Sequence, residues 1–423
     1  MSDRFPLLYD SEIMVVGGGP AGVAAAVSAA RTGGRVVLVE RYGFLGGMAT
    51  AGLVNPFMTF SAGGKQIIHG VFQELLERLE ELGGWGGEER DWSFDPEVMK
   101  HACEGLCQEA GVELAYHCLV CGAEARNGRI EGVVLANKSG IFQGRARVFV
   151  DCSGDGDLAA YAGAQFEKGR GEDGLCQPMT LNFRMTNVDE GRMPSWGEAE
   201  AIFRRAKAEG RLTNPRENLM YFLTPRKGEV HFNTTRIIGL DSSDPRQLSE
   251  AEVEGRRQVR EMVDFVRREV PGFERAELLY SGVQVGVRES RRILGQYVMT
   301  REDVLEARKH PDGIARGSYP IDIHSPTGEG TTIVPLPEGE SYDIPYGCLV
   351  PRGLENLLVA GRPISATHEA HGSTRIMPIC FATGQAAGTA AAMCVGAGCS
   401  PRELDVQVLR ERLMSQGANL GQI

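Results

Sequence analysis

A glycine-rich turn near the N-terminus limits what this chain can fold into. The run 13–16 is short and continuously apolar, as in a parallel strand buried on both faces. Gly17, Gly19 and Gly22 follow it in a G-x-G-x-x-G pattern, and the alanine-rich stretch 23–31 comes next. The first glycine allows a tight turn, the second lets the backbone approach a diphosphate, and the third lets helix and strand pack closely. This order predicts a Rossmann-type nucleotide-binding fold.

A second predicted strand ends in an acidic residue. The apolar run 35–39 follows Gly33 and Gly34, which are suited to ending the first helix, and it leads directly into Glu40. A carboxylate at this position binds the ribose hydroxyls of a dinucleotide and repels a 2′-phosphate. Strand, turn, helix, strand and acid therefore occur in the order that predicts a bound dinucleotide.

The residues after Glu40 point to a flavin. Gly46 and Gly47 lie in the stretch 41–50, and here the sequence resembles the two-dinucleotide-binding-domain flavoproteins. In that superfamily a Gly-Gly segment after the second strand runs beneath the flavin, whereas plain NAD dehydrogenases lack it. The stretch 48–60 has no cysteine and the chain has no second G-x-G-x-x-G with strand and helix, which argues against a pyridine-nucleotide disulfide oxidoreductase.

Later segments carry the same resemblance. The stretch 147–157 is similar to the strand and Ala-Thr-Gly-type turn beside the FAD, although Cys-Ser-Gly stands in place of that turn. The stretch 355–362 resembles the last strand of the FAD domain, and 375–388 resembles the helix whose N-terminus faces the flavin. The positive end of such a helix favours an anionic reduced flavin.

Within the superfamily the chain most resembles the FAD-dependent oxidoreductases, with fumarate-reductase-like flavoproteins as relatives. The pattern includes the stretches 46–53, 287–292 and 319–324. The resemblance implies an enzyme with FAD as its cofactor. The FAD-binding residues that we expect are Gly17, Gly19, Pro20, Ala21, Gly22, Glu40, Arg41, Gly46, Gly47, Met48, Ala49, Val120, Ser153, Gly154, Asp155, Gly361, Arg362, Arg375, Met377 and Ile379.

We expect an α/β fold in three segments. Residues 1–157 and 344–423 form a Rossmann-type FAD-binding domain with a parallel sheet and a β-meander, and 158–343 form an inserted α+β domain that caps the flavin and binds substrate. Local sequence patterns also predict helices at 66–82, 95–110 and 400–414 and a meander at 112–150.

Four side chains are candidates for the chemistry of the site. His371 lies between the last predicted strand and the helix that faces the flavin, where an imidazole can accept a hydroxyl or amine proton. Arg288 and Arg375 carry the planar guanidinium that suits a substrate carboxylate, and His324 follows a predicted strand that could line the same cavity. The alternative for Arg288 is an arginine–glutamate network that braces the domain interface.

Cysteines at 103, 107, 118 and 121 have a spacing that invites comparison with a metal site. Cys118 and Cys121 are an odd number of residues apart in a predicted strand, so they point to opposite faces. Cys103 and Cys107 share one face of a predicted helix with apolar residues. We therefore expect buried thiols and no metal.

The overall charge excludes some partners. The chain has 45 Lys+Arg against 56 Asp+Glu, a net charge of −11 that offers no attraction to nucleic acid or anionic membranes. No signal peptide or membrane span is expected, so the predicted compartment is the cytoplasm. Homo-oligomerisation stays open.

The function expected from these features is oxidation of a C–OH or C–N bond in a small polar or anionic substrate, with hydride passing to FAD and an unknown electron acceptor. One alternative is fumarate-reductase-like reduction of an activated C=C bond, with an arginine as proton donor. The other is a flavin electron-transfer subunit without a small substrate of its own.

Overall fold

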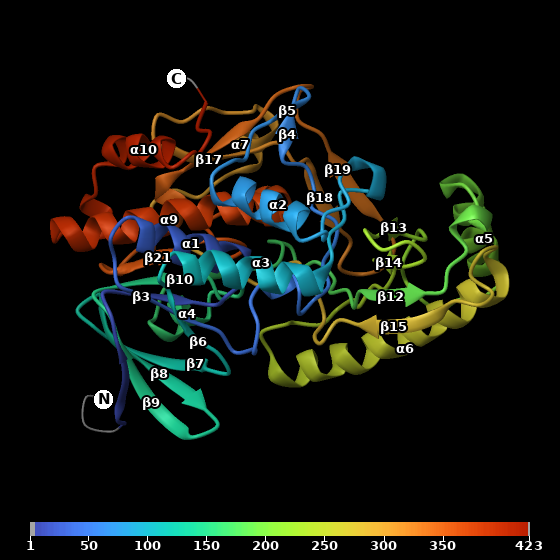
Figure 1. Ribbon diagram of the computed structural model, residues 1–423, viewed down its shortest axis with the longest axis horizontal. Helices are drawn as coiled ribbons and strands as arrows, with labels where there is room; N and C mark the ends of the chain where they lie inside the picture. The colour runs from blue at the N-terminus through green and yellow to red at the C-terminus, as the bar shows by residue number, and fades with distance from the viewer. Residues whose placement is uncertain (1–4, 422–423) are drawn as a thin grey trace.

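The computed structural model describes residues 5–421 and has a five-stranded parallel sheet at its centre (Figure 1). Its strand order is β21-β10-β2-β3-β6. The carboxyl ends of the strands lie level, because the register pairs Val16 with Val39 and with Asp151, and Asp151 with Val359. The strands are β2 (Ile13–Val16), β3 (Val36–Val39), β6 (Glu113–Ala115), β10 (Val148–Asp151) and β21 (Leu357–Val359).

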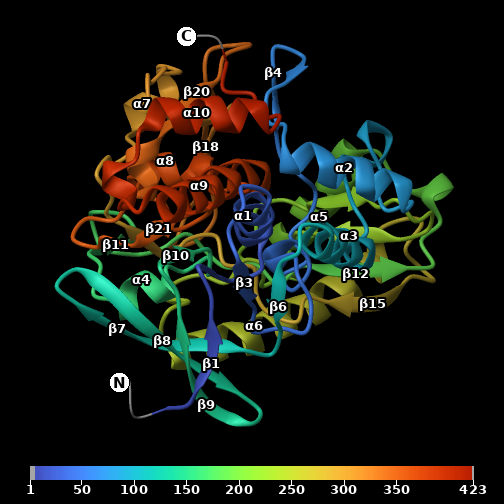
Figure 2. The same ribbon diagram turned by 60° about the vertical axis from the view of Figure 1, so that its left-hand side comes forward.

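The two faces of this sheet are covered differently, which explains why β2 is apolar throughout. Ile13 and Val15 pack against helices, whereas Met14 and Val16 pack against the meander. Figure 2 shows α1 and α9 over one face and the meander strands on the other. The helices of the first layer are α1 (Pro20–Arg31), α2 (Val71–Glu81), α3 (Pro96–Glu109) and α9 (Met377–Ala397).

The meander is a four-stranded sheet of order β1-β9-β8-β7. Asn127 and Gly128 both have positive φ between β7 and β8, as their Asn-Gly sequence predicts for a tight hairpin. The parallel pairing of β1 with β9 was not predicted, because β1 is mostly exposed and lacks an apolar pattern. The strands are β1 (Leu7–Asp10), β7 (Leu119–Arg126), β8 (Arg129–Asn137) and β9 (Gly140–Arg145).

A second antiparallel sheet lies beside the parallel one and has a hydrophobic core of its own (Figure 1). Its order is β13-β14-β12-β15, and two helices flank it. The sequence predicted an inserted α+β unit of this kind, and the mixed α/β fold is confirmed; the boundaries at 157/158 and 343/344 stay predictions. The elements are β12 (Phe183–Thr186), α5 (Trp196–Ala208), β13 (Tyr221–Leu223), β14 (Val230–Phe232), α6 (Pro245–Glu269) and β15 (Glu277–Ser281).

Short strand pairs and helices connect these layers. The hairpin of β18 (Ile321–His324) and β19 (Thr331–Val334) matters most, because it carries polar side chains toward the second sheet. The remaining strand pairs are β4 (Ser61–Ala62) with β5 (Lys65–Gln66), β11 (Phe166–Lys168) with β16 (Arg291–Ile293), and β17 (Gly313–Gly317) with β20 (Tyr342–Pro345). The remaining helices and 3-10 turns are η1 (Gly47–Ala49), η2 (Glu88–Arg90), α4 (Asp157–Tyr161), η3 (Glu190–Arg192), α7 (Arg301–Leu305), η4 (Tyr346–Leu349), α8 (His368–Thr374), η5 (Pro401–Glu403) and α10 (Val406–Ser415).

Two helix boundaries differ from the sequence prediction. The helix predicted at 66–82 begins only at Val71, because Gly70 has a φ of 62° and the residues before it form a short hairpin. The helix predicted at 400–414 is split: η5 ends at Glu403, and α10 begins at Val406 under a side-chain cap from Asp405. At Val71 the positive φ of Gly70 sets the start of the helix without a side-chain cap, whereas at Val406 the cap from Asp405 overrides the apolar periodicity.

One helix within residues 5–421 is long and apolar enough to suit a membrane span. It is α9, and 83% of its most apolar window is buried inside the protein. The core helix of a globular fold meets the same criteria. In this structure α9 packs on α1 through small residues rather than facing outward.

Candidate active site

A cavity of about 460 Å³ opens at the carboxyl ends of the parallel strands and reaches the second sheet. One part of its wall comes from the predicted FAD-binding segments, and the other from the substrate-side elements. The expected FAD residues that line it are Gly17, Gly19, Pro20, Ala21, Glu40, Arg41, Gly47, Met48, Ser153, Gly154, Asp155, Gly361, Arg362, Arg375 and Met377.

Five residues expected to bind FAD do not line this cavity. A Cβ on Gly22 would lie 1.7 Å from the Gly17 carbonyl oxygen, so Gly22 lets α1 pack against the turn. The Gly46 N–H donates to the Gly18 carbonyl at 2.8 Å, and Ala49, Val120 and Ile379 are buried in the surrounding core. These residues support the cavity wall from behind.

Two glycine segments form a cradle in which only backbone fits. Gly17 has a φ of 96°, and a Cβ there would lie 2.5 Å from the Cys152 carbonyl oxygen. A Cβ on Gly47 would lie 2.6 Å from the Gly19 Cα, so the turn after β2 and the Gly-Gly segment touch through bare backbone. The first turn of α1 has no side-chain cap at Gly19, which leaves its N–H groups for a diphosphate.

The acid at the end of β3 is held in place before any ligand binds. Glu40 is 5% exposed, and its carboxylate accepts from the Gly18 N–H at 2.6 Å and the Tyr42 N–H at 2.8 Å. Burial raises its pKa from the ordinary value, and these two hydrogen bonds oppose the shift. The carboxylate therefore lies where the ribose of a dinucleotide is expected.

The far wall of the cofactor region is the N-terminus of α9. Ile376, the N-cap residue, has no side-chain capping bond, and Ile376 and Met377 line the cavity. Pro378 is the second residue of this helix, a position where a proline fits because no backbone hydrogen bond is lost. The uncapped positive end of the helix suits the anionic ring of a reduced flavin. Together with the glycine cradle, these residues fit FAD.

The substrate-side wall holds an ionised carboxylate surrounded by donors. Asp322 Oδ2 accepts from Tyr319 Oη at 3.0 Å and from Arg375 Nη2 at 3.2 Å, and His324 Nε2 lies 3.4 Å away. Burial raises the pKa of Asp322, but its hydrogen bond with His324 and the charge of Arg375 outweigh burial and lower the pKa below the ordinary value. Burial and the neighbouring aspartate raise the pKa of Tyr319, which therefore keeps its proton.

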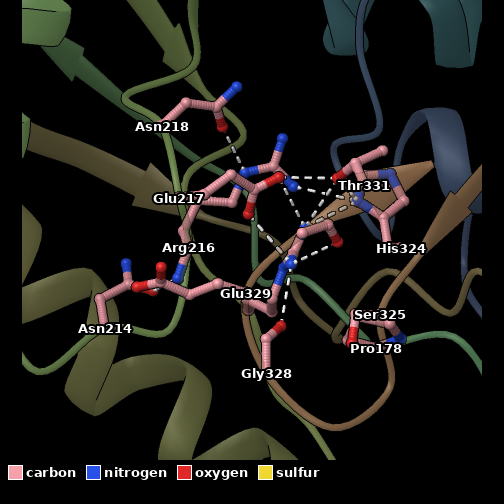
Figure 3. A network of polar contacts seen from close by, with 12 residues as sticks. Pro178, Asn214, Arg216, Glu217, Asn218, His324, Ser325, Gly328, Glu329 and Thr331 are labelled. Atoms are coloured by element: carbon pink, nitrogen blue, oxygen red, sulfur yellow. Dashed lines mark hydrogen bonds and ion pairs between the residues drawn. The ribbon is translucent and has the colours of Figure 1, made fainter. Parts of the chain in front are cut away.

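His324 is neutral, and its tautomer follows from its partners. Burial, together with the charge of Arg288, lowers its pKa to about 3. Arg236 Nη2 donates to His324 Nδ1 at 2.9 Å, and Arg216 Nη1 lies 3.4 Å from the same nitrogen (Figure 3). A guanidinium only donates, so Nδ1 is the acceptor and Nε2 carries the proton toward Asp322. His324 is thus unsuited to accept a substrate proton at Nδ1.

Arg288 enters the same cavity without a carboxylate partner. Its Nη1 donates to the Pro178 carbonyl at 2.9 Å and to the Thr180 hydroxyl, and Nη2 donates to Asn233 Oδ1 at 3.4 Å. None of the ion pairs among residues 5–421 involves Arg288. Burial and the charges of nearby arginines hold its pKa well below the usual range. The guanidinium therefore faces the cavity as a cation in need of an anion.

His371 does not lie in this cavity. It lies on α8 and is completely buried, and neither ring nitrogen has a hydrogen-bond partner in the described part of the chain. Burial and the charge of Arg292 hold its pKa well below the usual range. His368 instead pairs with Glu289 at 2.9 Å, and Glu289 also binds Arg292. The sequence predicted that His371 lies near the flavin. In the structure its position on α8 directs its ring into the core.

The bracing network considered for Arg288 forms around its neighbours. Arg291 pairs with Asp157 at 2.9 Å, and Glu289 lies between Arg292 and His368. Arg288 takes the opposite direction, toward the cavity. Sequence reasoning missed Arg216, which lies in an irregular segment without a recognisable motif.

The four cysteines at 103, 107, 118 and 121 do not form a metal site. Cys103 and Cys107 are buried on α3, and Cys118 is buried, as predicted. Cys121 is exposed, so the expectation of a buried thiol was wrong there, because its strand turns this side chain away from that of Cys118. Burial raises the pKa of Cys107 to about 12. Within residues 5–421 no group of three or more His, Cys, Asp or Glu side chains is arranged to hold a metal ion.

Comparison with known proteins identifies the family to which the chain belongs. The family model described as FAD dependent oxidoreductase matches residues 12–413. No curated protein matches the chain.

One solved structure shares the fold at low identity, and two others resemble the chain at lower TM-scores. A flavin-dependent brominase shares 13% identity at a TM-score of 0.50, over 96% of this chain and 83% of its own. A geranylgeranyl bacteriochlorophyll reductase-like protein of Thermoplasma acidophilum shares 13% at 0.47, over 97% and 84% of the two chains. L-proline dehydrogenase from P. horikoshii shares 15% at 0.45, over 97% and 99%.

Proposed function

The chain belongs to the FAD-dependent oxidoreductase family, and we propose that it oxidises a C–OH or C–N bond in a small anionic substrate whose carboxylate binds Arg288. The observation that carries this proposal is the lone guanidinium in the cavity wall. Arg288 has three oxygen partners, all neutral, and forms no ion pair within residues 5–421, although the charge of Asp322 acts on it from nearby. Arg288 is partly buried, so an anion that joins it stabilises its charge, and a guanidinium binds a carboxylate through two parallel hydrogen bonds.

The cofactor-binding segments form one part of the cavity wall, so their position determines which part is left for the substrate. FAD, when bound, accepts a hydride from the carbon being oxidised. The glycine cradle and the α1 N-terminus would hold the diphosphate of FAD, and Met377 and the substrate-side wall line the remaining part of the cavity, where the flavin would bind. Arg288 anchors the substrate carboxylate there, while Tyr319 and Arg375 border the same space. Holding the substrate at a fixed place beside the cofactor is the main contribution of these side chains.

Proton transfer favours an amine over an alcohol. Among the described residues that line the cavity, Asp322 is ionised but is a weak base, because its neighbours lower its pKa, and His324 Nδ1 already accepts from Arg236. The carboxylates of Glu217 and Asp155 are held in ion pairs with arginines. These groups are poorly suited to accept a hydroxyl proton. An alcohol must lose its hydroxyl proton as hydride leaves, which calls for a base. An ammonium group loses its extra proton to solvent, and the neutral amine that results can give up hydride without a base. C–N oxidation is therefore the form of the reaction that these side chains serve best.

A second candidate is reduction of an activated C=C bond. It is favoured by one proton donor in the wall, because burial and the charges of nearby arginines hold the pKa of Arg288 well below its usual range. A C=C reduction needs a proton at one carbon and a hydride at the other, and Arg288 has a proton to give. The same anionic substrate class serves both directions.

Anaerobic spectroscopy of the purified protein distinguishes the two candidates. Amino acids, hydroxy acids and their neutral amides are mixed with the oxidised protein, and bleaching of the visible flavin absorbance is followed. We expect bleaching by an anionic amine or hydroxy acid and none by its amide. Bleaching by the amide at an equal rate overturns the role of Arg288. If no compound bleaches the flavin but an enoate reoxidises the dithionite-reduced protein, the C=C reduction replaces the oxidation.

A further inference from the structure

Arg216 is a second buried guanidinium in the cavity wall without a carboxylate partner. It is 2% exposed and lies in the segment between α5 and β13. Its Nε donates to Asn218 Oδ1 at 2.8 Å, and its Nη2 lies 3.5 Å from Met220 Sδ. None of the ion pairs within residues 5–421 involves Arg216. Burial lowers its pKa to about 10, so it stays charged at neutral pH.

The polar network around Arg216 shows that the nearest acid is already engaged (Figure 3). Glu217 pairs with Arg236, with a closest distance of 3.0 Å, and accepts from Thr331 Oγ1 at 2.6 Å. Thr331 pairs in register with His324 across the β18–β19 hairpin, so the hairpin fixes both side chains. Glu217 therefore forms its ion pair with Arg236, and although its negative charge also acts on Arg216, Arg216 has no ion pair of its own within residues 5–421.

The other carboxylates near this cluster are also paired. Glu200 forms an ion pair with Arg204 at 2.7 Å, and Glu329 forms one with Lys207. The cluster itself contains four guanidinium groups and two carboxylates, which leaves a net charge of two positive units in a largely buried wall. Its members are Arg216, Arg236, Arg288 and Arg375 with Glu217 and Asp322.

We propose that the substrate carries a second acidic group, which binds Arg216 while the first carboxylate binds Arg288. The inference rests on the proposed function, because it assigns Arg288 to the first carboxylate. The substrate class is then a dianion: a dicarboxylate, or a carboxylate that also carries a phosphate or phosphonate. Two anionic groups neutralise the surplus charge of the wall, which one carboxylate does only in part.

His324 is a positioning residue in this arrangement. Its Nδ1 accepts from Arg236 and lies within reach of Arg216, so the ring separates the two guanidinium groups and holds them in place. Asn218 fixes the opposite side of Arg216 through Nε. The two terminal nitrogens of Arg216 have only a histidine nitrogen and a thioether sulfur as partners, which are weaker acceptors than a carboxylate.

Binding of unreactive anions to the oxidised FAD-loaded protein tests the second subsite. The dissociation constants of malonate, succinate and glutarate are measured from the perturbation of the flavin spectrum and compared with those of acetate and butyrate. We expect the best dicarboxylate to bind at least about 30-fold more tightly than a monocarboxylate. In Arg216→Gln this advantage disappears, while monocarboxylate affinity stays within about twofold. Phosphonoacetate distinguishes a phosphate-type second group from a carboxylate.

Matched variants keep the result interpretable. Arg216→Lys keeps the charge and should retain part of the dicarboxylate advantage, and Arg192→Gln, an exposed arginine paired with Glu274, should retain all of it. Equal binding of mono- and dicarboxylates in the wild type overturns the second subsite alone. If Arg288→Gln leaves both classes unchanged, the first subsite fails and the proposed function falls with it.

Discussion

The contact between α1 and α9 allows one substitution to test both packing and cofactor binding. A Cβ on Gly384 of α9 would lie 2.1 Å from the Ala21 carbonyl oxygen and 2.7 Å from the Ala21 Cα. Ordinary contacts begin at 3.4 Å, so Gly384→Ala must push the helices apart by about 1.3 Å at this point. Because the obstructing atoms are backbone, no side chain can rotate out of the way.

The expected magnitude follows from two opposing effects. Overpacking against rigid neighbours costs about 3 kcal/mol, at the upper end of the usual range. Replacing glycine by alanine within a helix recovers about 1 kcal/mol of backbone entropy. The net expectation is a loss of about 2 kcal/mol in the free energy of unfolding. Ala21 also lines the cavity, so its displacement should weaken FAD binding at least tenfold.

Urea unfolding of the apoprotein and titration with FAD measure the two effects. Gly396 is the matched control, because it lies near the end of the same helix and a Cβ there meets nothing within 4 Å. Gly396→Ala should be as stable as the wild type or slightly more stable, and should bind FAD normally. If Gly384→Ala matches Gly396→Ala in both measurements, the close approach of α1 and α9 is wrong.

Three further predictions concern the cofactor turn, a buried ion pair and acid sensitivity. Gly17→Ala places a Cβ against the Cys152 carbonyl at a φ of 96°, so the purified protein should lose its flavin absorbance while retaining its circular dichroism. Glu229→Gln leaves the buried guanidinium of Arg184 without its partner and should cost about 3 kcal/mol in urea unfolding. His324 has a pKa of about 3 when folded and 6.5 when unfolded, so the stability tied to its neutral form is present above pH 6.5 and is lost as pH falls toward 3. His324→Gln should flatten the stability–pH curve in that window by about 1.4 kcal/mol per pH unit, and an unchanged slope would contradict the assigned protonation state.

The sequence predicted the cofactor half of the site well because its constraints are local. Gly17 needs a positive φ, and Glu40 follows a buried strand that ends beside the glycine turn, so each position follows from a short stretch of chain. Helix boundaries were less predictable where a cap decides them. The apolar spacing predicted a helix from residue 66, but the positive φ of Gly70 delays its start to Val71, and Asp405 caps the last α-helix, which begins after residue 400.

The substrate half could not be assembled from the sequence, because it depends on tertiary contacts. His371 and His368 are three residues apart on α8, yet His368 pairs with Glu289 while His371 points into the core. Arg216 joins the cavity only because an irregular segment meets the β18–β19 hairpin, more than one hundred residues later. No spacing rule connects these residues. Their charge balance becomes visible only when the ion pairs of the folded chain are known.

The most direct test of the central claim is the concentration dependence of anaerobic flavin reduction in the wild type and in Arg288→Gln. The claim is that Arg288 binds the carboxylate of the molecule that reduces the flavin. We predict that the apparent dissociation constant of the reducing substrate rises at least about 30-fold in Arg288→Gln, because removing one partner of a buried charge pair costs about 2 kcal/mol or more. The neutral amide of that substrate should bind both proteins equally weakly. An unchanged dissociation constant in Arg288→Gln would contradict the claim.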